Sequence, residues 1–138
     1  MFERILLAVD GSEPSNRARE AAAELASRLE AEVRVLHVRE LESHGRAGPL
    51  SLEAPGEAAD LVNRVVADLR DRGVKATGEA YAVLAGAVAP HILSTAKEFG
   101  ASLIVMGTRG MTDFAALLVG SVAHKVIHHA ECPVLVIR

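Results

Sequence analysis

The stretch that decides the fold reads ASLIVMGTRGMTDFAALLVGS and covers residues 101–121. Its first six residues are small or aliphatic, which is typical of a strand buried on both faces of a parallel sheet. Gly107 follows at the carboxyl end of that strand, where open α/β sheets bind their ligands. After Gly120, apolar residues recur at helical spacing, at Val122, Ala123, Val126, Ile127 and Ala130. The stretch therefore predicts a strand, a glycine-containing loop and a helix.

The glycines of this stretch predict a phosphate-binding loop. Gly107, Gly110 and Gly120 allow backbone N–H groups to approach an anion without a Cβ in the way, and Ser121 adds a hydroxyl donor. The helix that follows directs its unpaired N–H groups and partial positive charge to the same place. The motifs G-x-x-x-x-G-K-[ST] and G-x-G-x-x-G are both absent from the chain, which argues against P-loop kinases and GTPases. Taken one at a time, each glycine could mark only a turn.

The composition predicts one globular domain over residues 1–138. The chain is 50% hydrophobic and 24% charged, and its net charge is −3. This balance, with three Phe, one Tyr and no Trp, argues against a nucleic-acid partner. The single cysteine, Cys132, cannot form a disulfide within the chain, and we expect it to be a packing residue. No signal peptide and no run of about 20 apolar residues is evident, so we expect a cytoplasmic protein without a membrane partner.

Strand and helix patterns alternate along the chain. Apolar runs predict five strands, at residues 5–9, 33–38, 76–83, 101–106 and 133–138. Helical periodicity predicts four helices, at residues 14–31, 57–72, 87–99 and from 120 onward. Ser12 or Ser15 is expected to cap the first helix, and residues 40–56 are expected to form a long loop. This order predicts right-handed βαβ crossovers, hence an α/β fold with a five-stranded parallel sheet and helices on both faces. The more polar third strand suits an edge.

Several of these features together resemble the universal stress protein family. They are Asp10 after the first strand, His37-Val38 closing the second, the spacing Gly107-x2-Gly110-x9-Gly120-Ser121 before a helix, and Cys132-Pro-Val-Leu-Val after it. The resemblance covers essentially all 138 residues. It implies a Rossmann-like three-layer sandwich of the adenine nucleotide alpha hydrolase-like type and a homodimer. Because the glycine-serine motif is intact, it also implies an ATP-binding stress or regulatory protein, with Mg or Mn held through the phosphates.

The resemblance implies a role for each matching residue at the base and ribose end of the nucleotide. Asp10 would lie at the ribose or near a phosphate-bound Mg ion, and the Val38 backbone would lie at the adenine edge. Gly107 would approach the ribose, while Ala8 and Met106 would line the base or sugar pocket. For Asp10 the alternative is an acid that forms the turn or caps the helix.

The phosphate end follows from the same resemblance. Gly110, Gly120 and Ser121 would hold the phosphates, and the N–H group of Val122 would add a donor at the start of the helix. Arg109 lies inside the motif, where it could pair with a phosphate or equally point into solvent.

No nucleophile paired with a base is evident elsewhere. His124 and His128 lie four residues apart, but no third ligand completes a metal site. His37 is expected to be a satisfied core histidine or a pocket wall. We therefore favour an ATP-binding regulatory module with at most slow hydrolysis, since a phosphotransferase needs a base and a committed metal site. A genuine ATPase or phosphotransferase and a nucleotide-independent dimeric interaction protein remain as alternatives, and a further protein partner is unknown.

The last strand, residues 133–138, is expected to form the dimer. It is apolar and is predicted to lie at an edge of the sheet, where unpaired backbone groups need a cover. Pairing with the same strand of a second copy would close the edge by two-fold symmetry. The alternative is that Arg138 alone protects it.

Overall fold

The computed structural model describes residues 1–43, 49–51, 55–108 and 119–138. The five predicted strands and the four predicted helices are all present, with bounds a few residues from those expected, and one short additional strand joins them. The elements are β1 (Arg4–Ala8), α1 (Glu13–Leu29), β2 (Glu32–Ser43), β3 (Pro49–Ser51), α2 (Pro55–Asp71), β4 (Ala76–Leu84), α3 (Val88–Phe99), β5 (Leu103–Gly107), α4 (Ser121–His129) and β6 (Val134–Ile137).

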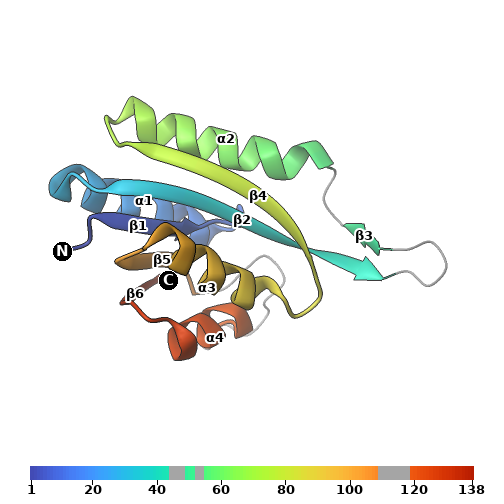
Figure 1. Ribbon diagram of the computed structural model, residues 1–138. Helices are drawn as coiled ribbons and strands as arrows, with labels where there is room; N and C mark the ends of the chain where they lie inside the picture. The colour runs from blue at the N-terminus through green and yellow to red at the C-terminus, as the bar shows by residue number, and fades with distance from the viewer. Residues whose placement is uncertain (44–48, 52–54, 109–118) are drawn as a thin grey trace.

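Five strands form a parallel sheet in the order β4, β2, β1, β5, β6. The chain moves from β1 outward through β2 to β4, and then returns to the other side of β1 for β5 and β6. The strand order therefore reverses between β1 and β5, which is the position where open α/β sheets bind their ligands. In Figure 1 the arrow of β2 points to the right, so this edge of the sheet lies on the right-hand side.

The segment 40–56 differs from the prediction of a continuous loop. Strand β2 continues to Ser43, because β4 pairs with it as far as the Leu41 and Leu84 register and β3 pairs with residues 41–43 in antiparallel fashion. Helix α2 also begins earlier, at Pro55. A pairing partner, rather than a local pattern, makes residues 40–43 extended, which is why periodicity did not reveal them. Figure 1 shows β2 and β3 reaching past the other strands.

The helices cover the sheet in two pairs, giving three layers (Figure 1). Helices α1 and α2 pack on one face, over a core that includes Val33, Val35 and Leu69. Helices α3 and α4 pack on the other face, over a core that includes Leu36 and Ile104. None of the helices in the described part of the chain has the length and apolar character needed to cross a membrane.

Helix α1 approaches the sheet closely because its inner face is made of small residues. Ala18, Ala22, Ala23 and Ala26 are buried. Leu29, the last residue of the helix, is 43% exposed, so the buried face consists of these alanines. This close approach governs how α1 meets the end of β5.

Candidate functional site

The turn after β1 is fixed by a local hydrogen-bond network around Asp10. Asp10 Oδ1 accepts the N–H of Ser12 at 2.9 Å, and the hydroxyl oxygen of buried Ser15 accepts the N–H of Asp10 at 3.0 Å. Of the two serines expected to cap α1, Ser12 is the N-cap, and its side chain accepts the N–H of Ser15. Gly11 has φ +81°, a conformation that other residues rarely adopt. Asp10 therefore forms the turn with one oxygen, while within the described residues Oδ2 has no hydrogen-bond partner and is available to a ligand.

The second strand presents the backbone of Val38 next to this turn. The carbonyl of Leu36 accepts the N–H of Val9 at 2.9 Å, so the backbone groups of Leu36 face β1. Backbone groups two residues apart on a strand face the same side, so those of Val38 face the space beyond the end of β1. The sequence had suggested that Val38 ends the second strand, whereas it lies inside β2. It nevertheless lies past Leu36, the last residue of β2 that pairs with β1.

His37 is the first residue of β2 after that ladder, and it is a buried histidine with a hydrogen-bond partner, as expected. It is 2% exposed, and its Nδ1 lies 2.7 Å from the carbonyl oxygen of Val9. Because a carbonyl only accepts, Nδ1 carries the proton. The Val9 carbonyl is thereby occupied by a side chain, and β1 and β2 separate at this point.

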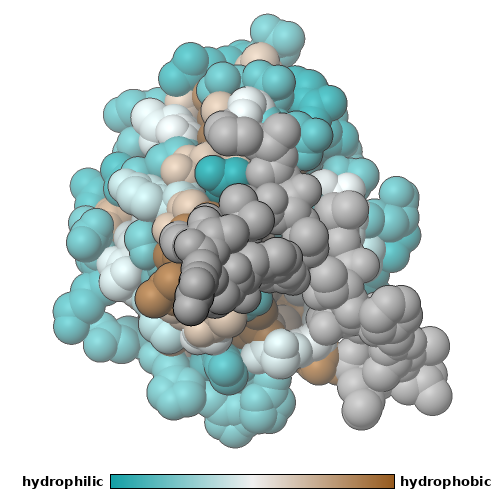
Figure 2. Space-filling view, turned by 90° about the vertical axis from the view of Figure 1, so that its right-hand side faces the viewer, coloured by the Kyte–Doolittle hydropathy of each residue, from teal (hydrophilic) through white to brown (hydrophobic). Residues whose placement is uncertain are grey.

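The two expected pocket-lining residues, Ala8 and Met106, share one apolar cluster with Val38 and Val122, whose backbone groups were expected at the adenine edge and at the phosphates. Ala8, Val38, Met106 and Val122 all belong to the apolar cluster beneath α3 and α4. Met106 is buried, and the other three are partly exposed. Figure 2 looks onto the carboxyl edge of the strands, where hydrophobic surface of the described residues lies near the middle and hydrophilic surface surrounds it. The fold therefore brings these residues, from three strands and one helix, into one apolar environment.

Gly107 is required by helix packing. A Cβ at this position would lie 2.9 Å from the backbone carbon of Pro14 and 2.9 Å from the backbone nitrogen of Ser15. Such a separation is shorter than real Cβ atoms show, and the backbone of the first turn of α1 would have to move. The sequence analysis had explained this glycine by the approach of a ligand; the structure adds the approach of α1, which holds Asp10 next to β5.

Gly120 directly precedes α4 and is hydrogen-bonded to Thr108. Its N–H donates to the Thr108 carbonyl at 2.6 Å, and the N–H of Thr108 donates to the carbonyl of Ile137 at 2.7 Å. Gly120 is the N-cap of α4 and makes no side-chain cap. The donors left for an anion are therefore those of the first turn, including Ser121, which is exposed, and Val122. Thr108 was not identified from the sequence, because its part is played by its backbone.

Two expected phosphate contacts, Arg109 and Gly110, lie outside the described residues. Nothing in the structure bears on their roles.

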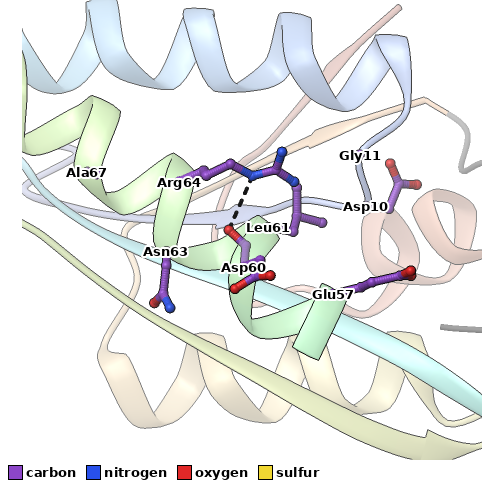
Figure 3. Close-up of a pocket in the computed structure, with 8 residues that line it drawn as sticks. All are labelled: Asp10, Gly11, Glu57, Asp60, Leu61, Asn63, Arg64 and Ala67. Carbon is purple, nitrogen blue, oxygen red and sulfur yellow. Dashed lines mark hydrogen bonds between the residues drawn. The ribbon is translucent and has the colours of Figure 1, made fainter. Parts of the chain in front are cut away.

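Figure 3 shows a pocket of ≈ 700 Å³ on the other side of the β1–α1 turn. It is lined by Asp10, Gly11, Glu57, Asp60, Leu61, Asn63, Arg64 and Ala67. The Arg64 side chain extends from α2 toward the turn, and its Nε donates to the Asp60 carbonyl at 3.3 Å. Three carboxylates face a single guanidinium, which disfavours an anion in this pocket. The pocket therefore places negative charge on the side of the β1–α1 turn that faces α2, away from the N-terminus of α4.

The remaining candidate residues are two histidines of α4 and the single cysteine. The rings of His124 and His128 lie in contact on the exposed face of α4, with centroids 4.4 Å apart. Within the described residues no group of three metal-binding side chains converges. Burial raises the pKa of the Cys132 thiol, which disfavours the reactive thiolate.

Comparison with known proteins links this arrangement to one family. The profile of the Universal stress protein family matches residues 1–138. The chain is 34% identical to Universal stress protein YxiE of Bacillus subtilis (strain 168), over 100% of both chains. It is also 36% identical to a universal stress protein of Thermus aquaticus, again over 100% of both.

Solved structures share the fold. Universal stress protein UspA from Lactobacillus plantarum superimposes with a TM-score of 0.82 at 23% identity, over 99% of this chain and 98% of that one. A universal stress protein from Archaeoglobus fulgidus in complex with dAMP gives a TM-score of 0.72 at 27% identity, over 100% of both chains. A universal stress protein in complex with cAMP gives 0.64 at 25% identity, over 99% of this chain and 97% of that one.

Proposed function

Since this chain belongs to the universal stress protein family, we propose that it is an ATP-binding regulatory module of that family, formed by residues 1–138 as one domain. The ligand would lie at the carboxyl edge of the sheet between β1 and β5. The observation that carries this proposal is the apolar cluster at this edge, which Val38 of β2 and Val122 of α4 share, next to the turn after β1 that carries Asp10. The relatives in complex with dAMP and cAMP support an adenine nucleotide as the ligand class.

The charges around the site favour one orientation of the nucleotide. Asp10, Glu57 and Asp60 make the α2 side of the turn negative, whereas the N-terminus of α4 carries unpaired N–H groups and partial positive charge. A chain of phosphates is attracted to α4 and repelled from the carboxylates. The phosphates would therefore lie at Gly120, Ser121 and Val122, with Gly110 and Arg109 as further contacts. The ribose would lie near Asp10 and Gly107, and the adenine at Val38, Ala8 and Met106.

A divalent ion would accompany the triphosphate. Within the described residues, the Asp10 carboxylate, whose Oδ1 accepts the N–H of Ser12, would be the group to contact such an ion, directly or through water. Mg or Mn would therefore be held mainly by the phosphates and would neutralise their charge, while Asp10 orients the ribose side.

Calorimetry with Mg-ATP tests this proposal. We expect saturable binding, and we expect Gly120→Val to abolish it while the circular dichroism spectrum is unchanged, because Gly120 has φ −60°, which valine can adopt. Ser121→Ala should weaken binding, whereas the matched change Ser94→Ala, at an exposed position of α3, should not. Undiminished affinity in Gly120→Val would refute the phosphate assignment. The absence of binding in the unaltered protein would favour the nucleotide-independent alternative.

Hydrolysis is expected to be slow. Dedicated phosphoryl-transfer enzymes turn over at about 1–100 s⁻¹ with a positioned base and a committed metal site, and within the described residues no group of three metal-binding side chains converges. Phosphate release from Mg-ATP should therefore fall far below that range. Turnover within it, lost on Asp10→Asn, would favour the ATPase alternative.

We also propose a homodimer through β6. Its four residues, Val134–Ile137, are apolar and only partly buried, and β6 pairs with β5 on one side within the described residues. An apolar edge of this kind favours two-fold pairing with a second copy. Light scattering at micromolar concentration should give the mass of a dimer, and a monodisperse monomer would rule out this interface.

A further inference from the structure

The carboxyl end of β6 is connected to the N-terminus of α4 by two backbone hydrogen bonds. The carbonyl of Ile137 accepts the N–H of Thr108 at 2.7 Å, and the carbonyl of Thr108 accepts the N–H of Gly120 at 2.6 Å. The first bond extends the parallel ladder of β5 and β6, in which Gly107 pairs with Ile137. A strand at the edge of the sheet is thus linked directly to the first residue of α4.

Thr108 is in a position to transmit this connection. It follows β5 directly, and it is only 9% exposed although it is polar. Its N–H and its carbonyl are both used, one toward β6 and one toward α4. Buried backbone groups are costly to leave unpaired, so the loss of one bond favours a rearrangement that affects the other.

Within the described residues, Gly120 makes one further backbone hydrogen bond besides that to Thr108. It is the N-cap of α4 without a side-chain cap, and its carbonyl accepts the N–H of His124 at 2.9 Å as the first bond of the helix. The bond to Thr108 therefore fixes where α4 starts relative to β5. The direction of the free N–H groups of Ser121 and Val122 depends on that start.

We propose that the Ile137 carbonyl and the Thr108 backbone are positioning groups of the nucleotide site, so that the last residues of β6 control the affinity for the phosphates. This inference rests on the proposed function, because it takes the N-terminus of α4 as the phosphate-binding end. It adds that an event at the edge strand, such as pairing with another chain, is coupled to nucleotide binding. By thermodynamic linkage the coupling is reciprocal.

Three variants separate the Ile137 carbonyl from its neighbours. Removal of Arg138 alone loses the hydrogen bond from Arg17 Nε to the Arg138 carbonyl and makes Ile137 the last residue, whose carboxylate oxygen still accepts the N–H of Thr108. Ile137→Ala keeps the carbonyl group and loses the side chain, which packs against the α1 and α2 core. Removal of residues 137 and 138 loses the carbonyl itself. Val134 to Val136 remain paired with β5 in all three.

The affinity for Mg-ATP is the first measurement. We expect removal of residues 137 and 138 to weaken binding at least tenfold, and the other two variants to stay within about threefold of the unaltered protein. Ile137→Ala serves as the control for lost stability, because its stability falls without loss of the carbonyl. Equal losses of affinity in Ile137→Ala and in the truncated protein would overturn the proposal.

Hydrogen exchange without nucleotide is the second measurement. In the truncated protein the amide of Gly120 should exchange at least tenfold faster, whereas the amide of Val9, bonded to the Leu36 carbonyl, should exchange at its original rate. An unchanged rate at Gly120 would overturn the proposal even if affinity falls. If the unaltered protein binds no nucleotide, the proposed function fails, while the Gly120 rate still decides whether β6 positions α4.

Discussion

Two glycines on the same face of the sheet are each covered by a helix, but their neighbours differ. A Cβ at Gly78 on β4 would overlap a methyl group of Val62 and lie 2.6 Å from Val66 Cγ2, both on α2. A Cβ at Gly107 on β5 would instead meet the backbone of Pro14 and Ser15 at the start of α1. Gly78 therefore maintains a packed core, and Gly107 maintains the place of the turn that carries Asp10. Identical glycines serve stability in one region and the site in the other.

The largest effect is expected for Gly78→Ala. The added methyl overpacks a buried layer of β-branched side chains, and overpacking costs about 1–3 kcal/mol; we expect about 3 kcal/mol here. Urea unfolding measures the loss, and the affinity of the folded protein for Mg-ATP should not change. The double variant Gly78→Ala, Val62→Ala should recover part of the loss, because it removes the methyl group of Val62 that clashes while that of Val66 remains. Strict additivity would contradict this assignment.

Gly107→Ala should have a smaller effect on stability and a larger one on the site. The first turn of α1 can shift by a few tenths of an ångström at a cost of about 2 kcal/mol, and Asp10 shifts with it. Affinity for Mg-ATP should fall at least tenfold. Gly56→Ala is the matched control, since a Cβ there meets nothing within 4 Å. If Gly107→Ala lost stability but kept full affinity, the two glycines would be equivalent and the comparison would fail.

Loss of the N-cap of α1 is expected to have a smaller effect on the same region. Ser12→Ala removes the acceptor for the N–H of Ser15, which should cost about 1 kcal/mol in the free energy of unfolding. Affinity should fall only slightly, because the N–H of Ser12 still reaches Asp10. Thermal unfolding and calorimetry on the same samples check both statements. A loss of affinity as large as that of Gly107→Ala would show that the cap, rather than the glycine contact, positions the turn.

The smallest effect is expected where α1 and the end of α2 are joined by Glu20 and Arg72. The hydrogen bond from Arg72 lowers the pKa of Glu20, with Arg19 contributing further. The ion pair therefore stabilises the fold above the usual glutamate pKa, and this stabilisation is lost as the pH falls through the lowered value. Both side chains are about half exposed, so Glu20→Gln should cost only about 0.5 kcal/mol at pH 7.

The difference in stability between Glu20→Gln and the unaltered protein should shrink when unfolding is repeated at about pH 3, below the usual glutamate pKa, because the unfolded protein then binds a proton at Glu20 that the folded ion pair resists. A difference that persists there would mean that the pair acts through packing.

The elements that the sequence predicted well are those with a local pattern. Apolar runs and helical spacing identified five strands and four helices, and Gly107, Gly120 and Asp10 stood out as residues with special backbone or charge. What the sequence did not reveal depends on partners far along the chain. The extension of β2 exists because β3 and β4 pair with it. Thr108 acts through its backbone N–H and carbonyl, which every residue except proline has, so its residue type gives no signal.

The reason for Gly107 illustrates the same limit. Its position after a strand was read from the sequence, but the contact that requires glycine comes from α1, more than ninety residues earlier. A single sequence cannot distinguish a glycine needed by a helix from one needed by a ligand. Here the two needs coincide, because the helix places Asp10.

A titration of backbone amide shifts with Mg-ATP tests the central claim most directly. The account predicts that the largest changes fall on Asp10, Val38, Ser121 and Val122, to which it assigns the nucleotide, and that amides of α2 beside Asp60 and Arg64 change little. Changes confined to the α2 pocket, or no changes at saturating Mg-ATP, would contradict it.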